Sequence, residues 1–478
     1  MAQKHNQIVF SEYNLSLNNN SNNYKQNGLS KKIENVCCTN GQIKSVNEFK
    51  KLFTAIEPAR ADAVENVFKT TINECLWVTD YHFYKSGKPV EYIVFCASNY
   101  KIYYYMLNAT NPQFVCLENV EFTSVPKFDY FIKDNQNVML FCSATDNMWV
   151  WDGINEPYQV LDAPKVNSMA VGLERLFVTC DIHPYSVLFS DDLDPSNWSM
   201  LAGESGELVF HDNMGKVLMV FALDNYIFVV REQGIVKLYG YKESTNSFTV
   251  SRMYTSTSII HKNTVAVCGD KIIFLCNDGI YSFDGLSAKK LYSQLNGLIF
   301  NTQNATAICV DNEYYLSVNM YQELPYNNAL ICVDLSNDNI TKVCCGYVYN
   351  RLCKLQINNV NMLIVLTSDI ATKNANMPLY MCKNAYKNAK NCNFVYLTNF
   401  LNVYPNSQIK VLTRLTFLCK TDITISIITD AFTKEYTVKA SDKFQTLKLN
   451  LKCNIFALMF SGNNADISHL KLDYTYVE

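Results

Sequence analysis

The residues with the most obvious chemical potential form one acidic run in the middle of the chain. Asp191, Asp192 and Asp194 place three carboxylates within four positions, directly after the largely apolar segment 185–190. Such a cluster could bind Ca²⁺, but the glycine and the closing glutamate of an EF-hand loop are missing. Turn formation is the simpler interpretation, because Asp, Asn, Ser and Pro stabilise tight backbone turns. The sequence therefore predicts a structural turn motif formed by Ser190, Asp191, Asp192, Asp194, Pro195, Asn197 and Trp198.

Signatures of known catalytic sites are absent from the rest of the sequence. The chain has no GxSxG, HExxH, P-loop or GxGxxG pattern. Its six histidines show none of the i, i+4 spacing that places two ligands on one helix face. We therefore expect a protein that is not an enzyme and that has no catalytic residues, no metal and no cofactor.

The net charge and the cysteine positions indicate which partners the protein can bind and in which compartment it is made. A net charge of −3, with 18% charged residues, argues against a reader of duplex DNA, which normally carries a basic face. Many of the 18 cysteines lie inside apolar runs, as do Cys96, Cys268, Cys276 and Cys332, and no CxxC pair occurs. Cys in such runs behaves as a small core residue, so we expect reduced thiols made in a reducing cytoplasm. No apolar stretch approaches the ~20 residues that span a bilayer, so no membrane insertion is expected.

A loose internal repeat determines the predicted fold of residues 75–400. Turn acids at positions 134, 174, 224, 270 and 311 are 40, 50, 46 and 41 residues apart. A period of ~40–50 residues with four short strands is typical of a β-propeller blade, which predicts about seven blades, with six or eight also fitting. Unrelated hairpins in sandwiches and a parallel solenoid are the alternatives. The predicted blade-turn residues are Asp224, Gly234, Gly240, Asp270, Gly279 and Gly285.

Three further segments complete the predicted all-β fold. The Asn- and Ser-rich residues 1–28 suggest a flexible, extended N-terminal arm. Residues 29–74 combine a hairpin around Asn40-Gly41 with a short helix that begins near Pro58. Residues 405–478 contain six alternating strands, which predict a C-terminal β-sandwich. We expect this sandwich to lie close enough to the last blade to cover an exposed edge.

Two blocks of sequence resemble a known class of proteins. FSDDLDPSNW (189–198) followed by LDNYIFVVREQGIVKLYGY (223–241) resembles the β-propeller structural proteins of tailed bacteriophages and prophages, of the tail hub or nozzle type or the DNA-stabilising type at the head–tail junction. The likeness is strongest over residues 172–285, and this chain departs from it in being richer in Cys and Asn. The motif marks a blade, so the resemblance assigns no functional residue.

The resemblance implies a role in a virus particle. It predicts a structural virion protein of the tail, nozzle or head–tail connector, made in the bacterial host cytoplasm, that lines or plugs the DNA exit path. Its expected partners are other virion proteins and copies of itself in a homo-oligomeric ring, and any contact with phage DNA should be weak and non-specific.

Two other functions remain open from the sequence. The run 190–198 also resembles the Asp-box of sialidases, although it lacks the glycine and occurs once. A sialidase-like enzyme would need three arginines that converge on a substrate carboxylate, for which Arg175, Arg231, Arg252 and Arg351 are the candidates. The first alternative is therefore a propeller that binds or cleaves glycans. The second is a cellular propeller scaffold.

Overall fold

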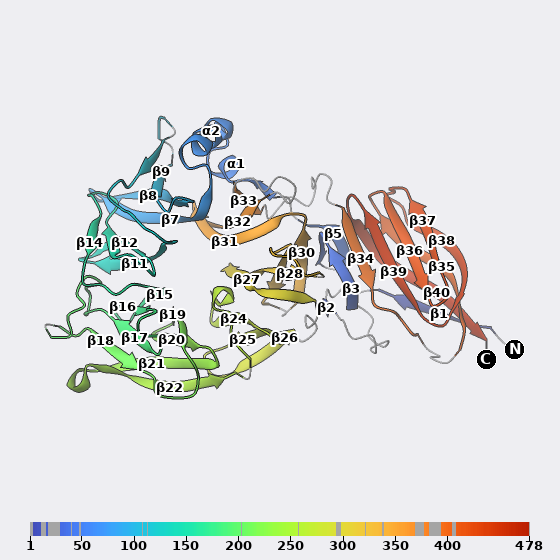
Figure 1. Ribbon diagram of the computed structural model, residues 1–478. Coiled ribbons are helices and arrows are strands. Elements are labelled where there is room, and N and C mark those ends of the chain that lie inside the picture. The colour runs from blue at the N-terminus through green and yellow to red at the C-terminus, as the bar shows by residue number, and fades with distance from the viewer. Residues whose placement is uncertain are drawn as a thin grey trace.

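Short antiparallel strands make up most of the molecule. The computed structural model describes residues 3–10, 16–17, 29–39, 41–46, 49–107, 109–111, 113–201, 203–256, 258–292, 298–320, 322–336, 339–368, 377–381, 393–403 and 408–477. In this part of the chain, seven successive four-stranded units form a ring, and a two-sheet sandwich stands beside it (Figure 1). The fold is therefore an all-β propeller with a sandwich, as the sequence predicts.

The first four blades use consecutive strands. Blade one comprises β7 (Cys75–Lys85), β8 (Lys88–Ala97), β9 (Ile102–Met106) and β10 (Phe114–Cys116). Blade two comprises β11 (Lys127–Lys133), β12 (Gln136–Cys142), β13 (Met148–Trp151) and β14 (Tyr158–Val160). Blade three comprises β15 (Ser168–Gly172), β16 (Arg175–Thr179), β17 (Ser186–Phe189) and β18 (Gly206–Val209). Blade four comprises β19 (Val217–Leu223), β20 (Tyr226–Arg231), β21 (Gly234–Lys242) and β22 (Ser247–Thr255).

The last three blades complete the ring. Blade five comprises β23 (Ala266–Cys268), β24 (Lys271–Cys276), β25 (Gly279–Phe283) and β26 (Ala288–Tyr292). Blade six comprises β27 (Ile299–Val310), β28 (Glu313–Met320), β29 (Ala329–Asp334) and β30 (Asn339–Cys345). Blade seven comprises β31 (Val348–Ile357), β32 (Val360–Ser368), β33 (Met377–Met381) and, from far earlier in the chain, β6 (Phe49–Lys51).

The repeated turn signals lie between the first and second strands of successive blades. Asp134, Asp224 and Asp311 occupy these turns with φ of 52°, 52° and 55°, and Asp270 follows Gly269, whose φ is 61°. Asp, Asn and Gly tolerate this left-handed conformation better than other residues, so they favour two-residue hairpin turns. The predicted repeat is therefore the repeat of the blades.

First strands of neighbouring blades lie side by side around the axis of the ring. β31 contacts β7, so the seventh blade meets the first and the ring closes. Apolar faces of adjacent blades pack on each other; for example, the rings of Phe228 in blade four and Phe283 in blade five have centroids 5.8 Å apart. Burial of these faces is the main force that holds the blades together.

The sandwich uses strands from both ends of the chain. Its C-terminal strands are the six predicted from the sequence: β35 (Lys410–Cys419), β36 (Ile423–Thr429), β37 (Thr433–Val438), β38 (Gln445–Cys453), β39 (Phe456–Gly462) and β40 (Asp466–Val477). The others are β1 (Gln3–Val9), β2 (Ser16–Leu17), β3 (Leu29–Glu34), β4 (Val36–Thr39), β5 (Gln42–Ser45) and β34 (Phe394–Thr398). The sheet orders are β4-β5-β40-β35-β38, with β1 beside β40, and β2-β3-β34-β39-β36-β37.

The expectations for the N-terminal segments need correction. Gln3–Val9, placed in a flexible arm, pairs along its length with β40, because an edge strand of the sandwich offers it backbone partners. The predicted hairpin is β4–β5, of which Gly41 is described and Asn40 lies outside the described residues. β34, inside the range expected for the propeller, pairs with β39 of the sandwich.

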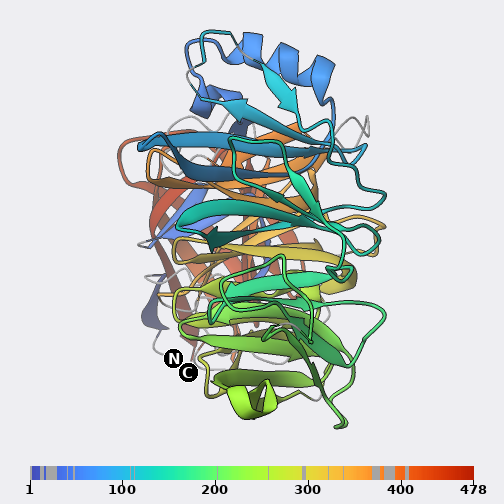
Figure 2. The same cartoon turned by 90° about the vertical axis from the view of Figure 1, so that its left-hand side faces the viewer.

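Blade six and the sandwich share one sheet. β30 pairs with β4 through Lys342↔Cys37 and Val343↔Val36, so the blade continues into the sandwich as a ten-stranded sheet. The sandwich thus extends the outer edge of blade six. The expectation that it covers an edge of the last blade is wrong, because β4 pairs with β30 of blade six. Figure 2 shows the blades from the side, with both chain ends close together at the sandwich.

Two α-helices lie on the outer rim beside blade one. α1 (Phe53–Ile56) and α2 (Ala61–Thr71) follow β6, and the ring of Phe68 packs 5.6 Å from that of Phe95. The short 3₁₀ turns η1 (Glu243–Thr245) and η2 (Lys262–Thr264) lie in blade connections. No helix within the described ranges has the length and apolar character needed to cross a membrane.

Cysteines occupy the core positions expected for them. Cys96, Cys268, Cys276 and Cys332 are each at most 3% exposed and lie within strands of blades one, five and six. Burial raises the pKa of the Cys96, Cys276 and Cys332 thiols to about 12, so these thiols are protonated, unreactive packing groups at neutral pH.

Candidate functional site

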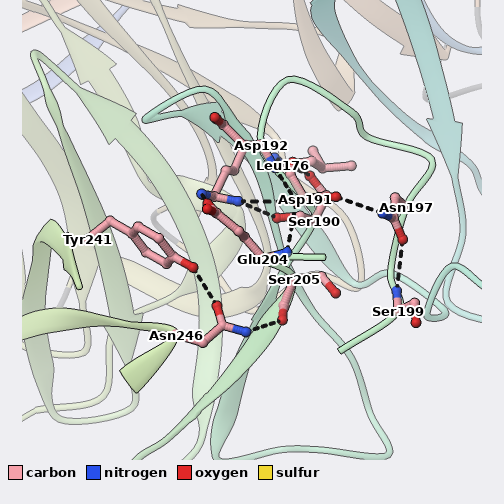
Figure 3. Close-up of polar contacts among 11 residues, drawn as sticks. Leu176, Ser190, Asp191, Asp192, Asn197, Ser199, Glu204, Ser205, Tyr241 and Asn246 are labelled. Carbon is pink, nitrogen blue, oxygen red and sulfur yellow. Dashed lines mark hydrogen bonds and ion pairs between the residues drawn. The ribbon is translucent and has the colours of Figure 1, made fainter. Parts of the chain in front are cut away.

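The acidic motif forms the connection between β17 and β18 in blade three (Figure 3). Ser190 is fully buried and continues the strand pairing beyond β17: its backbone N–H donates to the carbonyl of Leu176 at 2.9 Å. Its Oγ accepts a hydrogen bond from the backbone N–H of Leu176 at 3.0 Å and donates to the carbonyl of Asp191 at 3.0 Å. Ser190 therefore anchors the start of the loop to the second strand of its own blade.

The carboxylate of Asp191 is the centre of the loop. Its Oδ1 accepts hydrogen bonds from the backbone N–H groups of Asp192 and Glu204, both at 2.9 Å, and its Oδ2 accepts one from Asn197 Nδ2 at 2.6 Å. The backbone N–H of Asp191 also donates to the carbonyl of Asn197 at 3.0 Å. The Asp191 side chain thereby links the start of the loop to Asn197 and to its end at Glu204.

Asp194 connects the loop to the neighbouring blade. Its Oδ1 accepts hydrogen bonds from the backbone N–H of Ser196 at 2.9 Å and from Lys133 Nζ, at the end of β11 in blade two, at 2.8 Å. Burial acts to raise the pKa of Asp194, but the hydrogen bonds from Lys133 and Ser196 and the positive charge of Lys133 together outweigh it, so the pKa is lowered. This ion pair fixes the loop against blade two.

Pro195 and Trp198 close the motif. The indole Nε1–H of Trp198 donates to the carbonyl of Pro195 at 3.0 Å, and its ring packs against the apolar cluster between blades two and three. Asp192 is exposed, and its contribution to the loop is its backbone N–H. The carboxylates of Asp191 and Asp194 thus have separate structural tasks, whereas that of Asp192 lies exposed. Across the described residues, no group of three or more His, Cys, Asp or Glu side chains is arranged to hold a metal ion.

Arg175 is a central residue of this loop that the motif itself does not reveal. Its guanidinium is 3% exposed, lies 4.4 Å from the ring centroid of Tyr241, and forms an ion pair with Glu204. Its NH1 donates to the carbonyl of Ser190 at 3.4 Å. The repeat could have predicted that Arg175 begins the second strand of blade three, because it directly follows the turn acid Glu174. The sequence near Arg175 does not indicate its partners Tyr241 and Glu204.

Polar contacts continue from the loop into blade four. The hydroxyl of Tyr241 donates to Asn246 Oδ1 at 2.7 Å, and Asn246 Nδ2 donates to the carbonyl of Ser205 at 2.8 Å (Figure 3). Gly203 lies so close to the Asp191 carboxylate that a Cβ there would stand 2.4 Å from Oδ2. The motif is therefore a closed hydrogen-bonded unit between two blades.

The predicted blade-turn residues lie at strand junctions. Gly234 and Gly279 begin the third strands of blades four and five, Gly240 lies at a bulge in β21, and Gly285 follows β25. At Gly234 a Cβ would come within 2.1 Å of Met214 Cε and 2.3 Å of the carbonyl of Tyr254. The predicted glycines therefore lie where the backbone starts, bends or leaves a strand.

The four candidate arginines do not converge. Arg231 is fully buried in an ion pair with Asp212, and Arg252 NH2 lies 3.2 Å from the other oxygen of the same carboxylate. Arg175 belongs to the acidic loop, and Arg351 lies on β31 at the axis of the ring. The three-arginine arrangement required for a sialidase-like site is therefore not formed by these residues.

Comparisons with known proteins give no family. No protein-family profile and no curated protein matches the sequence. Among solved structures, the chain is similar to one described as "Crystal structure of BBS1N in complex with ARL6DN, soaked with mercury", with a TM-score of 0.40 and 10% identity over 62% of this chain and 88% of that chain. A likeness of this degree indicates nothing about function, and the propeller assignment rests on the strand pairing described above.

Proposed function

We propose that the protein is a structural virion component of a tailed bacteriophage or prophage. In this role it is a β-propeller subunit of the tail, nozzle or head–tail connector that lines or plugs the DNA exit path. The observation that carries the proposal is the shared ten-stranded sheet, which joins propeller and sandwich into one block. The continuous sheet resists hinge motion between the propeller and the sandwich, as a subunit of a mechanical assembly requires. The acidic motif likewise fixes blade three to blade two through the Lys133–Asp194 ion pair.

Exposed apolar side chains support assembly through protein–protein contacts. Loops of blades two and three expose Leu161, Ile182, Leu193 and Leu201, the last of them completely. Ile182 lies in the connection from β16 to β17, and Leu193 and Leu201 lie in the connection from β17 to β18, so apolar contact points are available at both ends of blade three. With a net charge of −3, contacts with other virion proteins and with copies of the same chain are favoured over tight contacts with DNA.

The proposal is tested by the assembly state. The full chain, examined by electron microscopy and mass measurement alone and within purified particles, is expected in a symmetric ring at the tail or the head–tail junction. The double variant Ile182→Asp, Leu201→Asp should reduce ring formation. The matched control Leu286→Asp makes the same exchange at a 75% exposed leucine in blade five and should assemble normally. A monomer with glycan-cleaving activity would overturn the proposal.

A glycan-binding protein is the second candidate, and one groove favours it. A cavity of about 640 Å³ between blades one and two is lined by polar groups that include Asn99, Asn119, Asp146 and Lys165. Trp149 also lines it, and its buried indole Nε1–H has no hydrogen-bond partner among the described residues. Binding of host-surface oligosaccharides that is lost in Trp149→Phe would favour this candidate. A glycan screen without binding would favour the assembly role.

A further inference from the structure

A second cavity lies on the axis of the propeller. Its volume is about 500 Å³, and its walls come from the first strands of blades one, two, six and seven. Asp80 on β7, Lys127 on β11, and Arg351 and Lys354 on β31 are the charged residues that line it. Three cations therefore face one carboxylate, in a protein whose overall charge is negative.

The single carboxylate is already committed to other partners. Asp80 Oδ1 accepts a hydrogen bond from the backbone N–H of Gln356 at 2.7 Å, and its Oδ2 lies 2.9 Å from His82 Nε2. Arg351 NH1 donates to the carbonyl of Leu76 at 3.3 Å, and Lys127 Nζ donates to the carbonyl of Asn167. No described carboxylate forms an ion pair with Lys127, Arg351 or Lys354. Their positive charges are therefore not neutralised within the described structure.

The charge cluster is unfavourable in the absence of an anion. Burial, and to a smaller extent the positive charges of Lys262 and Arg351, lowers the pKa of Lys127 to about 8. A desolvated ammonium beside like charges destabilises the fold unless a counter-charge compensates it. At neutral pH, Lys127 stays mainly protonated, so the cavity retains its excess of positive charge.

An adjoining cavity provides further hydrogen-bonding groups. It has a volume of about 670 Å³, shares Arg351 and Leu352 with the first, and is lined by residues that include Asn263, Asn304 and Asn350. Amide side chains accompany arginine and lysine where an oxyanion is bound through several hydrogen bonds. The two cavities together combine charge with directed polar groups.

We propose that the axial cavity binds a phosphate group through Arg351 and Lys127, with Lys354 adding positive charge at the rim. A tetrahedral dianion matches the excess of two positive charges and can accept paired hydrogen bonds from a guanidinium. With a volume of about 500 Å³, the cavity is too small to hold a nucleic-acid duplex, so the phosphate is either a free ion or the terminal group of a strand end. This inference is independent of the proposed virion role.

Titration calorimetry of the full chain with inorganic phosphate in chloride buffer at pH 7 tests the proposal. Arg351→Gln and Lys127→Gln should each weaken binding about tenfold, because each removes a charged donor. Lys452→Gln, which removes an exposed charge on β38 of the sandwich, is the matched control and should bind like the parent protein. Thermal unfolding of each variant confirms that it is folded. No binding by the parent protein at tens of millimolar phosphate, or binding that Arg351→Gln leaves unchanged, would overturn the proposal.

A second pair of titrations distinguishes the two sources of the phosphate. A short single strand with a 5′-phosphate is compared with the same strand without it. Tighter binding of the phosphorylated strand, lost in Arg351→Gln, supports the site and identifies a strand end as its ligand. Binding of inorganic phosphate alone supports the site for the free ion. Equal binding of both strands that Arg351→Gln does not change, without binding of inorganic phosphate, indicates surface charge and contradicts the proposal.

Discussion

At the scale of single residues, the same side-chain type does different work according to its surroundings. Asp191 accepts three hydrogen bonds in its loop, Asp192 beside it is exposed, and Asp129 on β11 is partly buried. The motif predicted from the sequence therefore identified the right loop but could not rank its carboxylates. Arg175 was a candidate for a substrate-binding arginine of a sialidase-like site. Its guanidinium instead stacks on Tyr241 of β21 in the next blade, a partner that no local sequence pattern indicates.

Substitution of the central carboxylate should loosen the loop. Asp191→Ala leaves the backbone N–H of Glu204 and the Asn197 side chain without their acceptor, so we expect a loss of about 2–4 kcal/mol in the free energy of unfolding. Asp192→Ala is the matched control at an exposed carboxylate and should change stability by less than about 0.5 kcal/mol. Denaturant unfolding measures both. Equal effects would contradict the central role of Asp191.

Asp129 should make the protein more stable in mildly acidic solution than at neutral pH. Burial raises the pKa of its carboxyl to about 6, against the opposing hydrogen bonds from the backbone N–H groups of Tyr130 and Val171. Between about pH 4 and pH 6, the carboxyl of Asp129 is protonated in the folded state and ionised in the unfolded state. The stabilisation that comes from proton binding is therefore complete below about pH 4 and is lost as the pH rises through about 6.

Removal of this charge should therefore stabilise the protein at neutral pH. Asp129→Asn is expected to increase the free energy of unfolding at pH 7 by on the order of 1–3 kcal/mol, and by almost nothing at pH 4. Denaturant unfolding across this pH range measures the difference. Asp270→Asn, the same exchange at an exposed turn residue, is the matched control. A constant difference at all pH values would show that desolvation of Asp129 is not its cause.

At the scale of elements, local patterns predicted strands well and their partners poorly. The alternating runs β35–β40 and the turn acids between first and second blade strands carry their signal within a few residues. β6 and β1 do not, because Phe49 pairs with Met381 and Gln3 pairs with Val477, and short strands contain no information about so distant a partner. The segments before the propeller were therefore expected as an arm and a hairpin, although they complete blade seven and the sandwich.

The closing strand of blade seven should be a point of local opening. The ring of Phe49 on β6 packs against Tyr347 and Tyr349, with centroids 5.9 Å and 6.3 Å away. Phe49→Ala should lower the free energy of unfolding by about 1–3 kcal/mol and speed amide hydrogen exchange in β33 more than in β25. Tyr84→Ala, which truncates a 71% exposed aromatic side chain, is the control. Uniform acceleration in all blades would show that β6 does not stabilise blade seven locally.

At the scale of the whole molecule, the propeller and the sandwich depend on each other. Blade six continues into β4, the β4–β5 hairpin continues into β40, and β40 pairs with β1, so one sheet connects the middle and both ends of the chain. The predicted inventory of blades and sandwich was right, but its division into successive regions was not, because sequence order does not determine which strand edges meet. One continuous sheet of this kind resists hinge motion between the propeller and the sandwich, which suits the proposed place in a virus particle.

The pairing of β6 with β33 also has a consequence for synthesis of the protein. Phe49–Lys51 leaves the ribosome more than three hundred residues before Met377–Met381, its partner in blade seven. At ~5–20 residues per second, the early strands wait for roughly 15–65 s before the ring can close. During that time β3–β6 carry unpaired backbone edges, which readily associate with other chains. Folding in the cell should therefore depend on chaperones that shield the N-terminal fifty residues, and slower translation should increase aggregation of the nascent chain.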